Sequence, residues 1–267
     1  MIKVAIVGAA GRMGRRLVAN VMESADLKLV GALEIPGCPL VGQDAGTVAG
    51  CGEAGVKIAA DPAVAFADAE AVINFSTSGI VPVTRAAMKA GASAVIGTTA
   101  LKAEERAELA EMAKNGGRIV QSPNMSVGVN LLFHLAAEAA KILDEKYDIE
   151  IVEMHHNQKK DAPSGTAERL GQILCAARGL DYDSDVRHGR VGLVGARTGH
   201  EIGMHSLRGG DVVGDHTVIF ATGGERIELT HRASSRDTFV IGALRAVRFL
   251  AAAPAGLYDM QDVLGFK

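Results

Sequence analysis

The stretch IKVAIVGAAGRMGRRLVANVM, residues 2–22, decides the fold. Its first part, Ile2–Val7, is short, apolar and rich in β-branched residues, which is typical of a strand buried in a parallel sheet. Gly8, Gly11 and Gly14 follow in a GxxGxxG spacing, and an amphipathic segment begins there. A glycine turn lets the backbone approach a pyrophosphate, and the start of the following helix stabilises the negative charge. The stretch therefore predicts the strand, turn and helix of a dinucleotide-binding domain.

The alternative is a glycine turn that is only structural, and two further features count against it. Glu34 ends the second predicted strand, where its carboxylate can accept hydrogen bonds from the adenosine ribose. The GTT motif of Gly97–Thr99 ends a later predicted strand, at the carboxyl edge where open α/β sheets bind their ligands. Together these features favour a bound dinucleotide.

The residues beside the ribose acid predict which dinucleotide is preferred. A 2′-phosphate is usually held by a cation at this place, but the residue after Glu34 is Ile35. Glu34 itself would repel the phosphate, and Arg12 in the glycine turn compensates only in part. We predict that NADH is preferred and that NADPH is the weaker cofactor.

The order of predicted elements changes near residue 124. Strand and helix alternate before it, which predicts a Rossmann-like, doubly wound parallel sheet. After it come a long helix, a strand that ends at His155, and a hairpin of two strands around Gly223 and Gly224. We predict an α/β protein with a dinucleotide-binding domain, residues 1–124 rejoined by 236–267. Residues 125–235 are expected to form an α+β domain with a mostly antiparallel open sheet.

Composition narrows the class of protein. The chain has 267 residues, nearly half of them apolar, so it can bury a sizeable core. A formal net charge of -3 argues against nucleic acid or an anionic membrane as a partner. Cys38, Cys51 and Cys175 form no CxxC pair, and no apolar run has the length of a membrane span. We expect a cytoplasmic protein without a disulfide framework or a thiolate metal site.

The segment EMHHNQKKDAPSGTAERL, residues 153–170, gathers groups that handle protons and bind anions. Alternation along the preceding strand places Glu153 and His155 on one face and His156 on the other. Zinc binding is the rival interpretation, but adjacent histidines at a strand end seldom chelate one ion, and no further Cys or HxxxH spacing supports it.

The second part of this segment predicts an anionic substrate. Ser164 can cap a helix whose first N–H groups, at Gly165 and Thr166, would bind a carboxylate. Lys159 and a histidine can neutralise a second carboxylate and donate a proton. A solvated loop is the alternative for Lys159 and Lys160, and we expect it to hold for one of them. The segment therefore suits a small, multiply anionic substrate.

The sequence resembles the dihydrodipicolinate reductase family, also called 4-hydroxy-tetrahydrodipicolinate reductases, over essentially its whole length. The motifs that carry the resemblance are VGAAGRMG (Val7–Gly14), GTT (Gly97–Thr99), SPNMSVGVN (Ser122–Asn130), EMHHNQKKDAPSGTA (Glu153–Ala167), SLRGGDVVGDHTVIF (Ser206–Phe220) and HRASSRDTF (His231–Phe239).

The resemblance implies reduction of 4-hydroxy-tetrahydrodipicolinate by NAD(P)H in the diaminopimelate–lysine pathway, and a homotetramer formed through the second domain. It implies that the cofactor is bound by Gly8, Ala9, Ala10, Gly11, Arg12, Met13, Glu34, Gly97, Thr98, Thr99, Ser122, Pro123, Asn124 and Met125. It assigns proton transfer to His155 and Lys159, and binding of the dicarboxylate substrate to His156, Gly165 and Thr166.

The sequence departs from the family pattern at three places. Ile35 stands where members that use NADPH well tend to have arginine, Met125 stands where an aromatic residue is frequent, and Ala100 stands where glycine is common. Two other functions share the nucleotide domain: an amino-acid dehydrogenase, which is not expected to have the DAPSGTA turn, and a redox-sensing regulator, which would need a partner-binding or basic DNA-binding segment.

Overall fold

Two sheets organise the chain, each with its own core. The computed structural model describes residues 1–98 and 101–267. It divides into a first unit of Met1–Val127 with Asp237–Lys267, and a second unit of Gly128–Arg236. The second unit is thus inserted, in sequence, between two parts of the first.

The first unit is built on a seven-stranded sheet in which every neighbouring pair is parallel. Its strands, in spatial order, are β12 (Gly256–Tyr258), β6 (Arg118–Gln121), β5 (Ser93–Ile96), β4 (Ala71–Asn74), β1 (Ile2–Val7), β2 (Leu27–Leu33) and β3 (Ile58–Ala59). From β3 to β6 this is the 3-2-1-4-5-6 order of dinucleotide-binding sheets. The predicted doubly wound parallel sheet is confirmed, with β12 added from the end of the chain.

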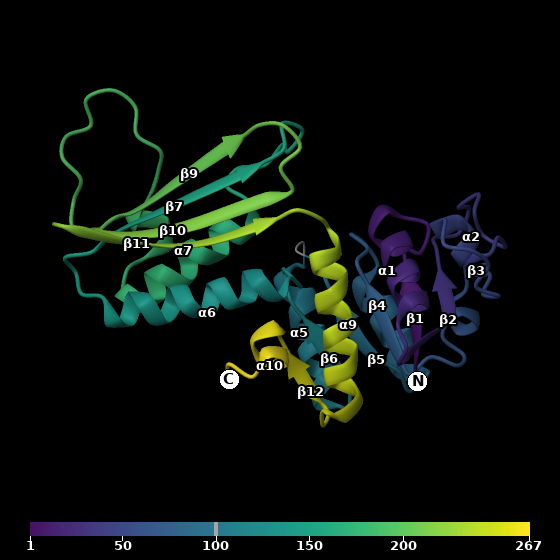
Figure 1. The fold of residues 1–267 in the computed structure, drawn as a ribbon. Coiled ribbons are helices and arrows are strands. Elements are labelled where there is room, and N and C mark those ends of the chain that lie inside the picture. The colour runs from purple at the N-terminus through teal and green to yellow at the C-terminus, as the bar shows by residue number, and fades with distance from the viewer. Residues whose placement is uncertain (99–100) are drawn as a thin grey trace. The chain divides into compact units, whose positions relative to one another are not determined.

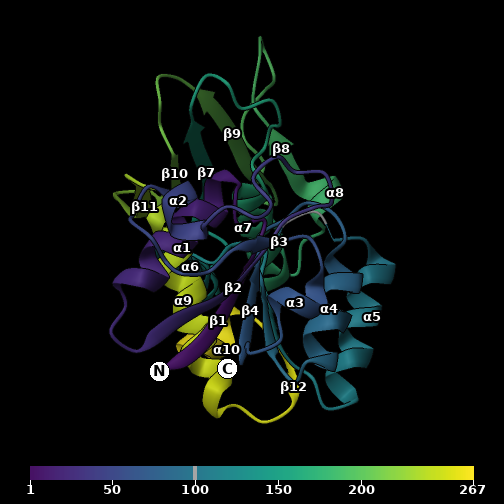
Figure 2. The same cartoon turned by 90° about the vertical axis from the view of Figure 1, so that its right-hand side faces the viewer.

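Helices cover both faces of this sheet, and alternate strand residues point to each face. One face packs against α1 (Arg12–Glu23), α2 (Ala45–Ala49), α9 (Asp237–Ala252) and α10 (Met260–Leu264). The other packs against α3 (Pro62–Ala65), α4 (Ile80–Lys89) and α5 (Ala103–Lys114). Figure 2 shows α3, α4 and α5 on one side of the strands and α1 and α9 on the other.

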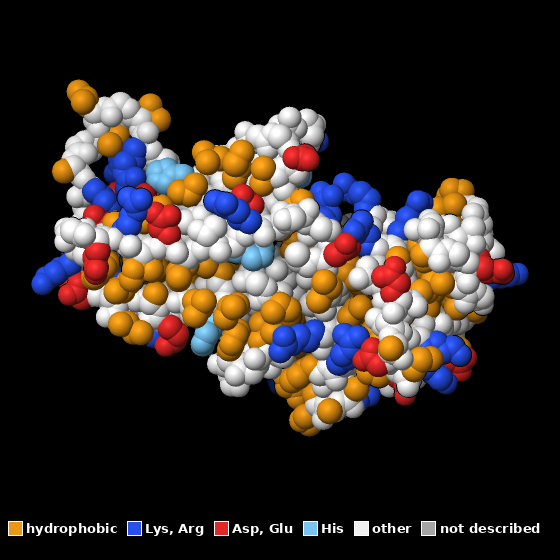
Figure 3. Space-filling view, viewed as in Figure 1, with side chains coloured by type: hydrophobic (Ala, Val, Ile, Leu, Met, Phe, Trp, Pro, Cys, Tyr) orange, Lys and Arg blue, Asp and Glu red, His pale blue; other side chains and the backbone are white. Residues whose placement is uncertain are grey.

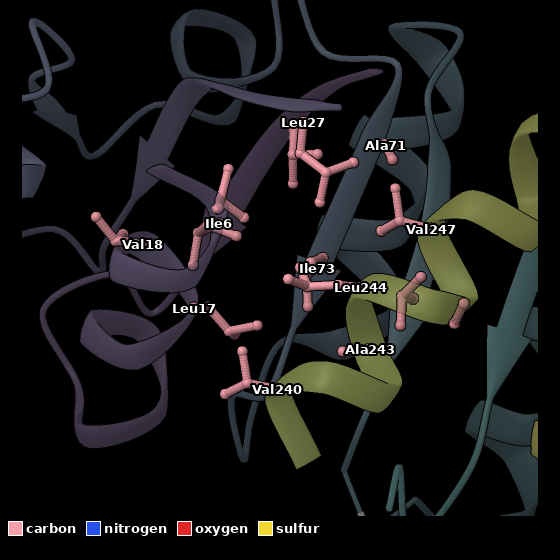
Figure 4. Packing of buried hydrophobic residues seen from close by; sticks show 14 of the residues in the cluster. Ile6, Leu17, Val18, Leu27, Ala71, Ile73, Val240, Ala243, Leu244 and Val247 are labelled. Carbon is pink, nitrogen blue, oxygen red and sulfur yellow. The ribbon is translucent and has the colours of Figure 1, made fainter. Parts of the chain in front are cut away.

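The largest core joins segments from the two ends of the chain. Leu17 of α1 and Val240 and Leu244 of α9 gather around Ile73 of β4, and all of them are buried (Figure 4). Burying a side chain of this kind contributes roughly 1.5–3 kcal/mol. Helix α9, from the C-terminal part of the chain, is therefore part of the nucleotide-binding fold.

The second unit is a five-stranded sheet with helices on one face (Figure 1). Its elements are α6 (Val127–Ile142), β7 (Asp148–His155), α7 (Gly165–Arg178), α8 (Tyr182–Asp185), β8 (Val186–His188), β9 (Ile202–Arg208), β10 (Gly214–Thr222) and β11 (Glu225–Ala233). The predicted hairpin is confirmed as β10 and β11, which pair from Gly214 opposite Ala233 to Thr222 opposite Glu225.

This second sheet is mixed: antiparallel pairing covers the larger part of it, as predicted, and the parallel pairings were not predicted. In the order β11-β10-β7-β9-β8, the pairs β11–β10 and β10–β7 are antiparallel, whereas β7–β9 and β9–β8 are parallel. Parallel neighbours need long connections, and α7 and residues 189–201 provide them. Neither the short β8 nor β9 was among the elements predicted from the sequence.

Within residues 1–98 and 101–267, no helix combines the length and the apolar character needed to cross a membrane. On the face drawn in Figure 3, basic and acidic side chains are interspersed.

Candidate functional site

The predicted cofactor residues of the first unit lie at one edge of its sheet. The glycine turn follows β1, Glu34 follows β2, Gly97 and Thr98 follow β5, and Ser122–Met125 follow β6. Because these strands are parallel neighbours around β4, their carboxyl ends meet at the same edge. Thr99, also predicted to bind the cofactor, lies outside the described residues.

The glycine turn is held in a geometry that only glycine allows at two positions. Gly8 has a φ of +70°, in the left-handed region that other residues rarely adopt. A Cβ on Gly14 would lie 1.9 Å from the carbonyl oxygen of Gly8, so α1 can pack against the turn only without a side chain there. Among the described residues, no side chain caps α1. The first N–H groups of that helix therefore remain available to an anion.

The carboxylate of Glu34 is fixed beside the turn. Its Oε1 accepts a hydrogen bond from the backbone N–H of Ala10 at 2.9 Å, and its Oε2 accepts one from Ile35 N at 3.2 Å. The side chain of Ile35 is 69 % exposed. The end of β2 therefore presents a carboxylate that is held by backbone N–H groups, next to an exposed apolar side chain.

The ends of β4 and β5 add two residues that the sequence analysis missed. A Cβ on Gly97 would lie 2.5 Å from the ring of Phe75, so ring and backbone are in close contact. Asn74 is buried, and within the described part of the chain its Nδ2 has no hydrogen-bond partner. A buried, unsatisfied donor is costly. The signal for Asn74 was a polar residue at the end of the otherwise apolar run AVIN.

The loop after β6 is held by its own polar groups. The Ser122 hydroxyl donates to the carbonyl oxygen of Asn124 at 2.9 Å, and Ser126 N donates to Asn124 Oδ1 at 2.9 Å. Pro123 is exposed, whereas the side chain of Met125 is 1 % exposed and belongs to the core. The buried side chain of Met125 therefore holds the loop against the core of the first unit.

These features fit a dinucleotide on grounds of shape and hydrogen bonding. Gly8 and Gly14 allow the tight turn and the close packing of α1 against it, the start of α1 offers N–H groups, and Asn74 keeps an unsatisfied donor at the same edge.

The predicted proton-transfer residues of the second unit lie at the end of β7. Glu153 is fully buried, as the alternation with the buried Ile149 and Ile151 predicts. Its Oε2 receives a hydrogen bond from His155 Nδ1 at 2.6 Å. The guanidinium of Arg208 on β9 donates to both carboxylate oxygens, each at 2.9 Å. The imidazole of His155 is thus tied to a buried ion pair.

The charge of this carboxylate is stabilised by its partners. Burial alone would raise the pKa of Glu153, but hydrogen bonds from His155, Arg208 and Ser206 outweigh burial and lower the pKa to about 2. Glu153 is therefore ionised at neutral pH and can only accept hydrogen bonds.

The DAPSGTA turn adjoins the same carboxylate. Ser164 N donates to Glu153 Oε1 at 3.2 Å, and Ser164 Oγ caps α7 by accepting a hydrogen bond from Ala167 N at 3.2 Å. Ser164 Oγ also lies 3.0 Å from His216 Nε2. Gly165 and Thr166, the predicted substrate residues, form the first turn of α7, with Gly165 exposed. The start of α7 and the imidazole of His155 therefore share one support.

The two lysines differ as the sequence analysis expected. Lys160 is exposed, whereas the side chain of Lys159 is 19 % exposed and its Nζ donates to Asp161 Oδ2 at 2.7 Å. This hydrogen bond lowers the pKa of Asp161. Because Asp161 is largely exposed, an anionic ligand can take its place beside the ammonium group at little cost.

His155 and its neighbour His156 are held by different contacts. His155 Nδ1 is engaged by Glu153, and the backbone N–H of His156 donates to the carbonyl of Val212 at 2.7 Å. The described residues contain no group of three or more His, Cys, Asp or Glu side chains that could hold a metal ion.

A second buried imidazole, His216 on β10, was not assigned a role from the sequence. Its ring lies edge-on to that of His155, with centroids 5.2 Å apart. Burial lowers the pKa of His216 to about 3, and the positive charge that His155 can carry acts in the same direction. Its Nδ1 has no hydrogen-bond partner among the residues that the structure describes. His216 is therefore a neutral imidazole at neutral pH.

This buried histidine predicts a pH dependence of stability. Below its ordinary pKa of 6.5, His216 binds a proton in the unfolded chain but not in the folded one until about pH 3. The free energy of unfolding should therefore fall as the pH drops below 6.5, by up to about 1.4 kcal/mol per pH unit. His216→Gln should show a shallower decrease between pH 7 and pH 5. Urea unfolding at several pH values checks this, and equal slopes for variant and wild type would contradict it.

Comparison with known proteins matches the chain in two consecutive parts. The family model described as "Dihydrodipicolinate reductase, N-terminus" matches residues 2–125, and "Dihydrodipicolinate reductase, C-terminus" matches residues 128–264. A 4-hydroxy-tetrahydrodipicolinate reductase of Syntrophotalea carbinolica is 51 % identical over 268 residues, and one of Geotalea daltonii is 48 % identical over 268 residues. Both alignments cover 100 % of this chain and of the relative.

Solved structures agree on the fold. A dipicolinate-bound dihydrodipicolinate reductase from Paenisporosarcina sp. TG-14 superposes with a TM-score of 0.77 at 24 % identity, covering 98 % of each chain. GenD2 from gentamicin A biosynthesis, solved in complex with NAD, has a TM-score of 0.61 at 13 % identity and covers 100 % of this chain and 87 % of its own.

Proposed function

The chain belongs to the dihydrodipicolinate reductase family, and on that premise we propose that it reduces 4-hydroxy-tetrahydrodipicolinate to tetrahydrodipicolinate with NAD(P)H, in diaminopimelate and lysine biosynthesis. The observation that carries the proposal is the match of both family models, in order, to residues 2–125 and 128–264. The hydrogen bond between His155 and Glu153 supports this proposal, because such a reduction needs a group that can donate a proton.

Cofactor binding is assigned to the carboxyl edge of the first sheet. The turn of Gly8–Met13 would bind the pyrophosphate, Glu34 the adenosine ribose, and Gly97–Thr99 with Ser122–Met125 would flank the nicotinamide. When bound, the reduced nicotinamide supplies the hydride. Asn74, whose buried Nδ2 lacks a partner within the described residues, is an additional candidate donor to the cofactor.

Substrate binding and proton transfer are assigned to the second unit. The N–H groups of Gly165 and Thr166 at the start of α7 would bind one carboxylate. His156 is also assigned to the substrate dicarboxylate. Hydride addition builds negative charge on the conjugated system of the substrate, so a cation and a proton donor nearby lower the barrier. His155 and Lys159 have these properties, and we assign proton donation to them.

The test of the proposed reaction is direct. The full-length protein is mixed with NADH and enzymatically generated 4-hydroxy-tetrahydrodipicolinate, and the absorbance of the reduced nicotinamide is followed. Rapid loss of the band is expected. Appearance of the same band from NAD with aspartate or homoserine, without loss of NADH in the first mixture, would favour the amino-acid dehydrogenase. Binding of NADH without turnover would favour the redox-sensing regulator.

The preference for NADH over NADPH is a prediction that a single residue should change. Ile35→Arg places a guanidinium beside the ribose, where it can form charge-assisted hydrogen bonds with a 2′-phosphate. We expect kcat/KM for NADPH to rise about tenfold, because a gain of about 1.4 kcal/mol is a factor of ten. The value for NADH should change little.

Ile35→Gln is the matched control, since it adds a polar side chain without the charge. It should leave the ratio of the two kcat/KM values near that of the wild type. A wild type that already prefers NADPH strongly would overturn the interpretation of Glu34 and Ile35.

The assembly and the cellular setting are also part of the proposal. We place the protein in the cytoplasm and expect a homotetramer through the second unit, as the family resemblance implies. Analytical ultracentrifugation at the assay concentration tests the assembly, and a monomer would contradict it.

A further inference from the structure

We propose that Glu153, held by Arg208, is a positioning residue: it keeps the proton of the neutral His155 imidazole on Nδ1, so that Nε2 is the nitrogen that exchanges a proton with the substrate. This inference deepens the proposed function and rests on the assignment of proton transfer to His155. Glu153 is fully buried, so it acts through the imidazole of His155 and not by contact with substrate or cofactor.

The hydrogen bonds of Glu153 determine which nitrogen of the His155 imidazole carries a hydrogen. An ionised carboxylate is only an acceptor, and Glu153 Oε2 lies 2.6 Å from His155 Nδ1. That nitrogen must therefore carry the hydrogen of the bond. In a neutral imidazole the other nitrogen, Nε2, then has the free electron pair, as in other carboxylate–histidine pairs.

Arg208 keeps the carboxylate charged and in place. Its Nη1 donates to Oε2 and its Nη2 to Oε1, each at 2.9 Å, in the bidentate geometry that arginine and carboxylate favour. Arg208 Nη2 also donates to the carbonyl of Asp161 at 2.7 Å. A buried carboxylate without such a partner would be strongly unfavourable.

The same carboxylate sets the start of α7 relative to His155. Its Oε1 accepts the N–H of Ser164, the residue immediately before Gly165. The two oxygens of Glu153 therefore support different parts of the site, one the imidazole and the other the turn that is assigned to the substrate carboxylate. A small movement of Glu153 would displace both.

The space around His155 Nε2 is also limited. A Cβ added to Gly214 would lie 3.0 Å from this nitrogen, and the His216 ring stands edge-on beside the imidazole. The backbone of β10 and the neutral His216 ring restrict the position of the His155 imidazole. The hydrogen bond to the charged carboxylate of Glu153 then sets the orientation of the ring.

The test combines nitrogen NMR with kinetics on the full-length protein. In protein labelled with 15N-histidine, at a pH where the imidazole is neutral, the His155 signals should show hydrogen on Nδ1. The signals are assigned by their loss in His155→Asn. Wild-type signals that show hydrogen on Nε2 would overturn the proposal without any variant.

Glu153→Gln should move the hydrogen toward Nε2, because an amide can donate to Nδ1 where the carboxylate could not. We expect kcat to fall roughly 10- to 100-fold, with KM within about threefold of wild type. Glu153→Asp keeps the negative charge and should retain hydrogen on Nδ1 and recover part of kcat. A Glu153→Gln protein with unchanged tautomer and kcat would refute the role.

Glu150 offers a matched control on the same strand. It accepts hydrogen bonds from Arg190, Arg197 and His205, but alternation puts its side chain on the other face of β7. Glu150→Gln should leave kcat and the His155 signals unchanged. An equal loss of kcat in both variants would mean that any paired carboxylate of this strand matters, and would refute positioning by Glu153.

The outcome also separates this inference from the proposed reaction. The tautomer is measured on the free protein and needs no turnover. Hydrogen on Nδ1 in the wild type, moved in Glu153→Gln, supports the Glu153–His155 coupling even if 4-hydroxy-tetrahydrodipicolinate is not reduced, and that second result would refute the reaction alone.

Discussion

Replacing His155 with alanine is expected to lower kcat by at least about a hundredfold, because general acid–base catalysis contributes roughly 10²–10⁴-fold. Lys159→Ala should have an effect of the same order, since it removes the cation that opposes the charge built up by hydride addition. In both variants KM should change less than kcat. Steady-state kinetics with NADH and 4-hydroxy-tetrahydrodipicolinate measures both quantities.

His156→Ala is the matched control for this prediction, because the two histidines are neighbours in sequence with different proposed roles. His156 is assigned to the substrate carboxylate, so its loss should raise KM more than it lowers kcat. If His155→Ala and Lys159→Ala both leave kcat within a few-fold of wild type, the assignment of proton transfer fails.

Gly14→Ala is expected to reduce kcat/KM for NADH by roughly a hundredfold, since displacement of binding groups by about 1 Å can cost this much. The added Cβ would lie 1.9 Å from the carbonyl oxygen of Gly8 and 2.7 Å from Ala9 Cα. Because backbone atoms rather than flexible side chains are in the way, α1 must move away from the turn. Overpacking of this kind also destabilises a protein by about 1–3 kcal/mol, which thermal unfolding measures.

Gly223→Ala provides the control for this substitution. Gly223 lies in the turn of the β10–β11 hairpin, and a Cβ there would meet no described atom within 4 Å. Both kcat/KM and the melting temperature should stay near the wild-type values. A Gly14→Ala protein that binds and uses NADH normally would show that the turn is not where the pyrophosphate is held.

The first sheet could be predicted because its signals are local. Short apolar strands, the glycine turn and amphipathic helices follow one another, and right-handed crossovers then fix a parallel sheet. The β10–β11 hairpin could also be predicted, because Gly223 and Gly224 lie between two strand-like runs. The mixed order of the second sheet was not, since the position of β9 beside β7 depends on a distant pairing rather than on a local pattern.

The candidate site was predicted only where neighbours in sequence are also neighbours in space. His155, Lys159 and the start of α7 lie within one short segment. Arg208 and His216 reach the site through strand register instead, since Arg208 stands opposite His155 and His216 stands opposite Glu153. Register of this kind depends on the packing of the whole sheet, so the ion pair of Glu153 and Arg208 could not be foreseen.

The insertion of the second unit has a consequence for the order in which the protein is made. As the chain leaves the ribosome, residues 128–236 are complete before α9, β12 and α10 have been synthesised. Until then β6 lacks its outer neighbour β12, and the apolar face of α1 lacks Val240 and Leu244. The inserted unit can therefore finish folding first. Until α9, β12 and α10 have been synthesised, the first unit keeps an open sheet edge and uncovered apolar side chains.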